Sequence, residues 1–141
     1  MVYLTRRETF NAAHKLSRPD WTDERNAEVF GKCANKNWHG HNYVLHVTVA
    51  GQPHPETGFV MDAKVLRDII RQYVTDVVDH ANLNMDVEWM DKTVQPTTEN
   101  LCIAFWGQLV GPIEATGVKL HKIKLAETEN IHAEYYGPAG E

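Results

Sequence analysis

The sequence predicts an α+β domain in which an antiparallel sheet packs against helices on one of its faces. Two strand patterns come first, two helical patterns follow in the middle of the chain, and two strand patterns close it. Strands grouped with strands and helices with helices are typical of this class. Because the chain shows no repeat and no linker, residues 1–141 are expected to form a single domain.

The first two predicted strands span residues 3–14 and 39–50, where the polarity of the side chains alternates. In the second of them the apolar residues of one parity share a face: Tyr43, Leu45, Val47 and Val49. The segment between the two strands, residues 15–36, is polar and irregular, so no element is predicted in it.

The middle of the chain predicts two helices. Asp62 is a suitable N-cap for a helix over residues 63–78, where apolar residues recur at helical spacing. The run from Pro96 to Asn100 is typical of a helix start, and a second helix is expected over residues 99–110. Strands over residues 119–127 and 131–136 complete a four-stranded sheet. Such a sheet has two open edges that must be covered or paired, which predicts an oligomer.

Composition excludes several classes of function. The formal net charge is −5, which disfavours a general nucleic-acid surface but allows a small anion in a local positive pocket. No apolar run approaches the roughly 18 residues of a membrane helix. The first eight residues resemble a strand and not a signal peptide, so a cytoplasmic protein without membrane contact is expected.

The two cysteines differ in their surroundings. Cys33 and Cys102 are 69 positions apart, which is not a disulfide framework. Cys102 lies in an apolar helical pattern and is expected to be a buried small hydrophobe. Cys33 lies in a polar stretch where packing does not explain it.

Three of the eight histidines are candidates for a metal site. His39 and His41 point to the same side of an extended strand, because residues i and i+2 share a face. His14, at the end of the first strand, is the best third ligand. Three imidazoles with one open position is the pattern of catalytic zinc. Histidines on a strand surface are the alternative. No role is assigned to the remaining candidates: His46, which has the opposite parity and should face away, and His54, His121 and His132.

Five ordered motifs resemble one known family. They are Phe10-Asn11-Ala12-Ala13-His14, residues 33–43, Asp79-His80-Ala81-Asn82-Leu83-Asn84, Pro96-Thr97-Thr98-Glu99-Asn100 and Glu127-Thr128. Together they resemble the 6-pyruvoyl-tetrahydropterin and 6-carboxy-tetrahydropterin synthases over nearly the whole chain. The resemblance implies a tunnelling fold (T-fold), in which subunits join their sheets into a β-barrel. It also implies trimers stacked into homo-hexamers, with active sites between subunits.

The resemblance also implies roles for individual residues. It makes His14, His39 and His41 zinc ligands and Cys33 the catalytic base. The alternatives for Cys33 are a fourth ligand in a closed structural zinc site or a free thiol without a role. Asp79 and His80 would be the partner pair of the cysteine, although a histidine at a helix end is also favoured by the helix dipole.

The same resemblance places three residues against the pterin ring: Thr98, Glu99 and Glu127. One carboxylate can accept from the adjacent N–H and amino groups of the ring, and Glu127 is the preferred anchor. Helix capping is the alternative for the first two, and a solvated strand end for Glu127. The cations for a triphosphate are left open among Arg6, Arg7, Lys15, Arg18, Lys32 and Lys36.

The spacing of the motifs favours one branch of the family. Five residues separate Cys33 from His39, as in the pyruvoyl branch, which acts on dihydroneopterin triphosphate and eliminates triphosphate. The 6-carboxy branch of queuosine biosynthesis typically has three. Trp38 departs from the small residue usual before His-Gly-His, which leaves substrate preference open. A non-catalytic, zinc-containing pterin-binding protein is the alternative of another class. A zinc hydrolase is disfavoured because no His-Glu-x-x-His motif supplies its base.

Overall fold

The computed structural model describes residues 1–140, so the predicted domain is described except for Glu141. Its sheet has the strand order β3-β1-β2-β4-β5. The antiparallel strands are β1 (Val2–His14), β2 (His39–Gly51), β4 (Lys119–Thr128) and β5 (Ile131–Tyr135). A fifth strand, β3 (Ala81–Asn82), pairs parallel with β1. The prediction of a purely antiparallel four-stranded sheet was therefore wrong, because two residues are too few to show an alternating pattern.

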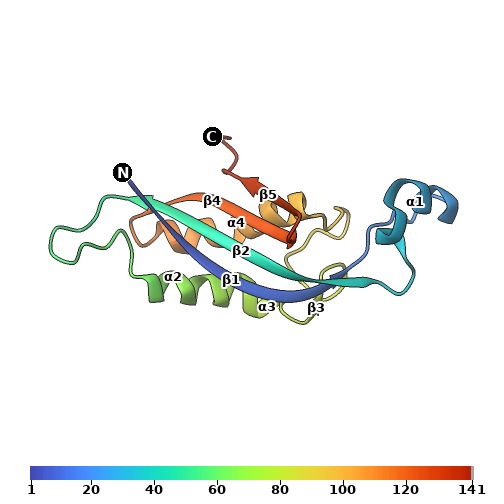
Figure 1. Cartoon of the computed structure of the whole chain (residues 1–141), viewed down its shortest axis with the longest axis horizontal. Coiled ribbons are helices and arrows are strands. Elements are labelled where there is room, and N and C mark those ends of the chain that lie inside the picture. The colour runs from blue at the N-terminus through green and yellow to red at the C-terminus, as the bar shows by residue number, and fades with distance from the viewer. Residues whose placement is uncertain (141) are drawn as a thin grey trace.

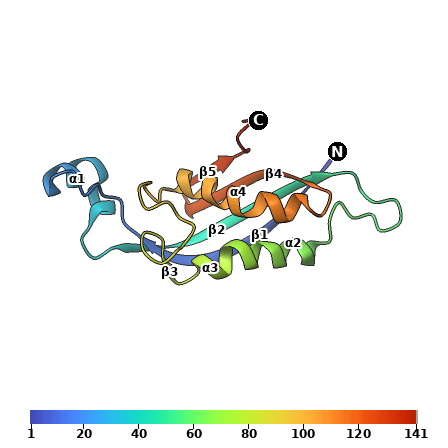
Figure 2. The same ribbon diagram turned by 180° about the vertical axis from the view of Figure 1, so that it is seen from behind.

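The two predicted helices lie together on one face of the sheet, as expected (Figures 1 and 2). The first runs without a break over residues 63–78, as α2 (Ala63–Ile70), a π turn η2 (Arg71–Thr75) and α3 (Asp76–Val78). Asp62 caps it by accepting from the backbone N–H of Lys64 at 2.8 Å. The second helix is α4 (Thr98–Glu114).

The π turn has a physical reason in the spacing of the buried residues. Leu66, Ile70, Val74 and Val78 are fully buried and recur every fourth position. An α-helix has 3.6 residues per turn, so such a stripe drifts around the helix axis. One wider π turn corrects the drift and keeps all four side chains against the sheet.

Helix α4 continues four residues beyond its predicted end at Val110. The pair Gly111-Pro112 is a stop signal in sequence, yet Pro112 lies inside the helix. The next residue, Ile113, is fully buried, and its carbonyl accepts from the hydroxyl of Thr116 at 2.7 Å. Packing of this last turn therefore outweighs the local cost of proline.

A further helix, α1 (Asp23–Phe30), and a 3-10 turn, η1 (Gly31–Ala34), occupy the segment in which no element was predicted. Thr22 caps α1 by accepting from the N–H of Arg25 at 3.1 Å. The helix has almost no buried face and lies at one end of the molecule, apart from the sheet and its helices (Figure 1). It was missed because its sequence shows no apolar stripe, the main helix signal.

The two faces of the sheet differ in how far the helices cover them. The predicted apolar face of β2 is fully buried against the helices: Tyr43, Leu45, Val47 and Val49. The opposite face carries Asn42, Val44, His46 and Thr48, and the helices leave it uncovered (Figures 1 and 2). We call it the open face. Among residues 1–140, no helix has the length and apolar character needed to cross a membrane.

Candidate metal centre

The register of β1 and β2 brings three histidines together. His14, the last residue of β1, lies opposite His39, the first residue of β2, and Ala12 lies opposite His41. The three imidazole ring centroids are 4.5 to 5.1 Å apart. These rings point toward the helix side of the sheet, beside Tyr43. The geometry expected for the His-x-His pair and its third partner is therefore present.

His14 is held in a single orientation by a backbone contact. It is buried, and its Nδ1–H donates to the carbonyl of Pro96, just before α4, at 2.8 Å. This hydrogen bond leaves Nε2 as the atom with a free lone pair. An outer hydrogen bond of this kind is usual for histidines that bind metals.

Glu127, near the end of β4, is the fourth member of the group. Its Oε1 lies 3.2 Å from Nε2 of His14 and 3.1 Å from Nε2 of His41. The donor atoms of His14, His39, His41 and Glu127 all lie within 4.8 Å of one another. Both contacts are within ion-pair distance, yet neither meets the angles of a hydrogen bond.

Unsatisfied nitrogens indicate a missing ligand. Nε2 of His14 and His41 and both ring nitrogens of His39 are buried and have no hydrogen-bond partner within the described chain. Buried polar groups are nearly always hydrogen-bonded, so four such atoms in one place call for an explanation. A cation bound by the three imidazoles would satisfy one nitrogen of each ring, and three imidazoles with one open position suit zinc.

Burial favours the neutral form of two of the imidazoles, those of His14 and His39. The pKa of His14 is lowered, mainly by burial, against the opposing effect of its bond to Pro96. The pKa of His39 is lowered by burial and next by the neighbouring His41. Neutral imidazole is the metal-binding form, because the proton must leave before the nitrogen can coordinate.

Cys33 is not part of this group. It is half-buried in η1, and its carbonyl accepts from the N–H of Leu16 at 2.8 Å. The fourth donor near the histidines is Glu127 and not Cys33. The arrangement therefore gives no support to a closed site of three histidines and a cysteine. Cys102, in contrast, is a buried thiol whose pKa burial raises to about 12, in line with its predicted packing role.

Two residues of the site were not found by sequence analysis. Tyr43 lies with its hydroxyl 3.5 Å from Nδ1 of His14. Its pKa is raised by burial and then by the negative charge of Glu127, so the hydroxyl stays protonated. The parity of β2 could have indicated Tyr43, which follows His39 and His41 on the same face. No sequence signal points to the carbonyl of Pro96.

Asp79 and His80 lie away from the histidine group. Oδ1 of Asp79 accepts from the N–H of Asn11 at 2.9 Å, and Oδ2 lies 2.9 Å from Nδ1 of His80. The pKa of Asp79 is lowered, first by that backbone N–H. Asn11 is three residues from His14, or about 10 Å along β1. The side chain of His80 is 82% exposed, and its φ of 60° turns the chain away after α3.

The remaining predicted site residues are not gathered at the centre. Thr97 caps α4 by accepting from the N–H of Asn100 at 3.3 Å. Thr98 is buried in the first turn, and Glu99 is exposed. Trp38 has a φ of 67°, in the left-handed region that favours glycine, and Lys15 lies over its ring.

Comparison with known proteins agrees with these features. Residues 3–138 match the family model described as 6-pyruvoyl tetrahydropterin synthase. The chain belongs to this family. A 6-pyruvoyl tetrahydrobiopterin synthase of Drosophila melanogaster is 39% identical over 98% of this chain and 81% of the fly protein. The structure of the Caenorhabditis elegans 6-pyruvoyl tetrahydropterin synthase superposes with a TM-score of 0.83 at 37% identity, covering 96% of this chain and 95% of the worm chain.

Members of the other branch are more distant. A 6-carboxy-5,6,7,8-tetrahydropterin synthase of Rickettsia bellii is 26% identical over 95% of this chain and 99% of its own length. The prediction of membership in this enzyme family, and of greater similarity to the pyruvoyl branch, is thus confirmed.

Proposed function

We propose that this chain is a zinc-dependent 6-pyruvoyl-tetrahydropterin synthase of the cytoplasm. It converts 7,8-dihydroneopterin triphosphate to 6-pyruvoyl-tetrahydropterin and eliminates triphosphate. The observation that carries the proposal is the group of unsatisfied imidazole nitrogens in a chain that matches the family almost end to end. Bound zinc would supply Lewis acidity to the side-chain oxygens of the substrate, which makes an adjacent C–H proton easier to remove.

His14, His39 and His41 hold the metal in this proposal, and Glu127 holds the pterin ring. The carboxylate of Glu127 can accept two parallel hydrogen bonds from the N–H and amino groups of the ring. Its side chain is 19% exposed and its Oε1 lies 3.1 Å from His41. A ring bound there would therefore lie directly beside the metal, with its reacting side chain over the imidazoles. Thr98 and Glu99 are assigned to the rim of the same pterin site.

Cys33 is the proposed base. A thiol becomes a useful base when nearby positive charge favours its thiolate, and metal bound at the neighbouring histidines supplies such charge. Asp79 and His80 are the proposed proton carriers on the other side of the substrate. Because His80 is exposed and its dyad lies about 10 Å along β1 from His14, we assign this dyad to the site of a neighbouring subunit.

Assembly into a homo-hexamer of two trimers is part of the proposal. Strand β3 pairs with Ala12 and Ala13, and Asn11 bonds to Asp79 and His80, which leaves residues 2–10 of this β1 edge without a neighbouring strand in the described chain. Strand β5 forms the opposite edge of the sheet. Pairing of these two edges between copies would satisfy their backbone groups and close a barrel.

The test is turnover by the purified, zinc-loaded protein on dihydroneopterin triphosphate, with products identified by mass spectrometry. We expect triphosphate and a 6-pyruvoyl product. His39→Ala should abolish turnover and metal binding together, whereas the matched control His54→Ala, in an exposed turn, should retain both.

Other outcomes would overturn the proposal in distinct ways. Acetaldehyde and a 6-carboxy product would place the chain with the 6-carboxy synthases of queuosine biosynthesis. A metal-loaded protein that binds the pterin without turnover would be a binding protein.

A further inference from the structure

The connection between the 3-10 turn η1 and strand β2 leaves the sheet as a tight loop. The last opposed pair in the ladder of β1 and β2 is His14 and His39. Continuation of this register would place Asn37 opposite Leu16. The N–H of Leu16 instead donates to the carbonyl of Cys33 at 2.8 Å. The rest of the connection therefore projects out of the ladder, and Cys33 takes the position beside β1 that Asn37 would otherwise have.

Trp38 is the residue at which this loop re-enters the strand. Its φ is 67°, and its N–H donates to the carbonyl of Asn35 at 3.2 Å. This φ lies in the left-handed region, where a bulky side chain is an outlier that costs free energy. Such outliers persist only where surrounding contacts hold them, and they gather at functional sites. The strain at Trp38 therefore calls for a contact that holds the residue in place.

Lys15 supplies that contact. Its Nζ lies 5.6 Å from the centre of the Trp38 ring, within the range of a cation–π interaction. The backbone of Lys15 is itself fixed by the side chain of Asn84, which accepts from its N–H at 2.9 Å and donates to its carbonyl at 2.8 Å. The half-buried ring of Trp38 is thus held against the end of β1.

Two contacts therefore fix this loop to β1. The hydrogen bond from Leu16 to Cys33 holds the end that follows η1, and the contact of Lys15 with Trp38 holds the end that enters β2. Both contacts lie within two residues of His14, or about 7 Å along the strand. Only four residues separate Cys33 from Trp38, so a displacement at Trp38 is passed on to Cys33.

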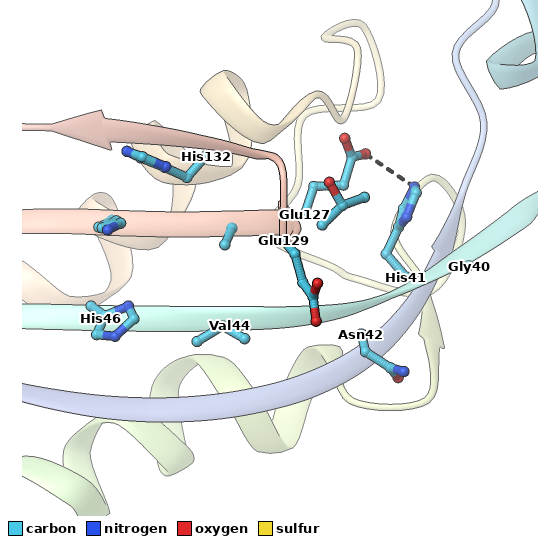
Figure 3. Close-up of a pocket in the computed structure, with 11 residues that line it drawn as sticks. Gly40, His41, Asn42, Val44, His46, Glu127, Glu129 and His132 are labelled. Atoms are coloured by element: carbon cyan, nitrogen blue, oxygen red, sulfur yellow. Dashed lines mark ion pairs between the residues drawn. The ribbon is translucent and has the colours of Figure 1, made fainter.

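The thiol is not part of the pocket beside the metal centre. That pocket has a volume of about 630 Å³ and is lined by Gly40, His41 and Glu127, among other residues (Figure 3). Cys33 is not among the residues that line it. The distance between the thiol and a molecule bound in this pocket is therefore set by the loop and not by the strands.

We propose that Trp38 is a positioning residue for Cys33. Lys15 holds the Trp38 ring, the ring holds the end of the loop, and the loop holds the thiol toward the histidine group. A small residue at this position would fit the left-handed backbone, but it could not make the contact with Lys15. The inference rests on the proposed function, because Trp38 acts only through the base of that reaction.

The first experiment measures the thiol and not turnover. The full-length protein in its native assembly is alkylated with iodoacetamide, with and without bound zinc, and modification of Cys33 is followed by mass spectrometry. In the original protein the rate should be at least about five-fold higher with zinc bound, because nearby positive charge favours the thiolate. In Trp38→Gly the difference should shrink to about two-fold or less. Cys102, which is buried, should stay unmodified and reports any unfolding.

Two outcomes of this experiment would refute the proposal. An equal zinc effect in both proteins would show that Trp38 does not position the thiol. No zinc effect in the original protein would show that the loop does not hold Cys33 near the metal.

Rescue variants separate the ring from the backbone conformation. Trp38→Phe keeps a ring for Lys15 and should keep most of the zinc effect, whereas Lys15→Gln should reduce it and add no further loss to Trp38→Gly. Trp21→Ala is the matched control, because this ring also lies under a cation, with Arg25 at 4.0 Å, but beside α1. It should keep the full zinc effect. A Trp38→Phe protein as impaired as Trp38→Gly would remove the contact with Lys15 from the explanation.

Stability measurements distinguish positioning from a purely structural role. Trp38→Gly should change Tm and zinc content little, because glycine adopts a φ of 67° without strain, which offsets the loss of a half-buried ring. A variant that loses both Tm and zinc would make Trp38 a structural residue, and the proposal would fail.

Kinetics provide the last readout. In Trp38→Gly, kcat for dihydroneopterin triphosphate should fall about ten-fold or more, as part of the contribution of a general base is lost, while KM stays within about two-fold. An unchanged kcat would refute the positioning role. Failure of turnover in the original protein would bear on the proposed function alone, because the alkylation rates do not require turnover.

Discussion

The histidines on β2 show how one strand builds two different environments. His41 faces the helices and meets two imidazoles and a carboxylate, whereas His46 faces outward and meets two cations. The two residues are only five positions apart and have the same chemistry. The alternation of side chains along the strand therefore places one residue in the candidate metal centre and the other on the open face.

The largest expected effect comes from removing an imidazole of the buried histidine group. His41→Ala should lower metal affinity by more than the roughly 10–100-fold that loss of an outer hydrogen-bond partner costs, and turnover should fall with it. Metal analysis after dialysis and a turnover assay measure the two effects. His46→Ala is the matched control on the open face and should retain full metal content. Equal metal loss in both would contradict the division of the strand into two faces.

The Cys33→Ala variant tests whether turnover can be lost while metal binding is kept. Turnover should fall about 10²–10⁴-fold, the usual contribution of a general base, while metal content stays complete. Cys102→Ala, which removes the buried thiol, should keep most of its activity. A Cys33→Ala protein with full turnover would remove this residue from the mechanism.

The two faces should also differ in their contribution to stability. Leu45 is fully buried, so Leu45→Ala should lower the free energy of unfolding by about 2–5 kcal/mol. Val44, the neighbour on the open face, is only half-buried, and Val44→Ala should cost clearly less. Urea denaturation of the metal-free proteins measures both. Equal losses would mean that the open face is covered in solution, as it would be by another subunit.

The smallest expected effect is a pH dependence of stability in the metal-free protein. The pKa values of His14, His39 and His46 are all lowered, mainly by burial, from a usual value of 6.5. Below about pH 6.5 the unfolded chain takes up protons that the folded chain does not, so stability falls as the pH falls. Thermal melts at pH 7.5 and 5.5 should show a drop that His39→Gln reduces. A drop of the same size in that variant would assign the effect to other groups.

Local patterns in the sequence were sufficient for much of the fold. Alternation placed β1, β2, β4 and β5, and the Asp62 cap with its apolar stripe placed the helix over residues 63–78. The elements that were missed lack such patterns. Helix α1 has almost no buried face, β3 has two residues, and α4 passes through a proline because Ile113 is buried.

By itself, the sequence determined which chemical groups are present and which of them share a strand face. It indicated His14, His39 and His41 as one set because spacing along a strand controls direction, and the family motifs drew attention to Glu127. Only the tertiary structure decided how β4 brings Glu127 to within 3.2 Å of His14, and how Pro96 orients that ring. It also decided that Arg7, His46 and Lys124 form a row, because strand register depends on packing between distant segments and not on local sequence.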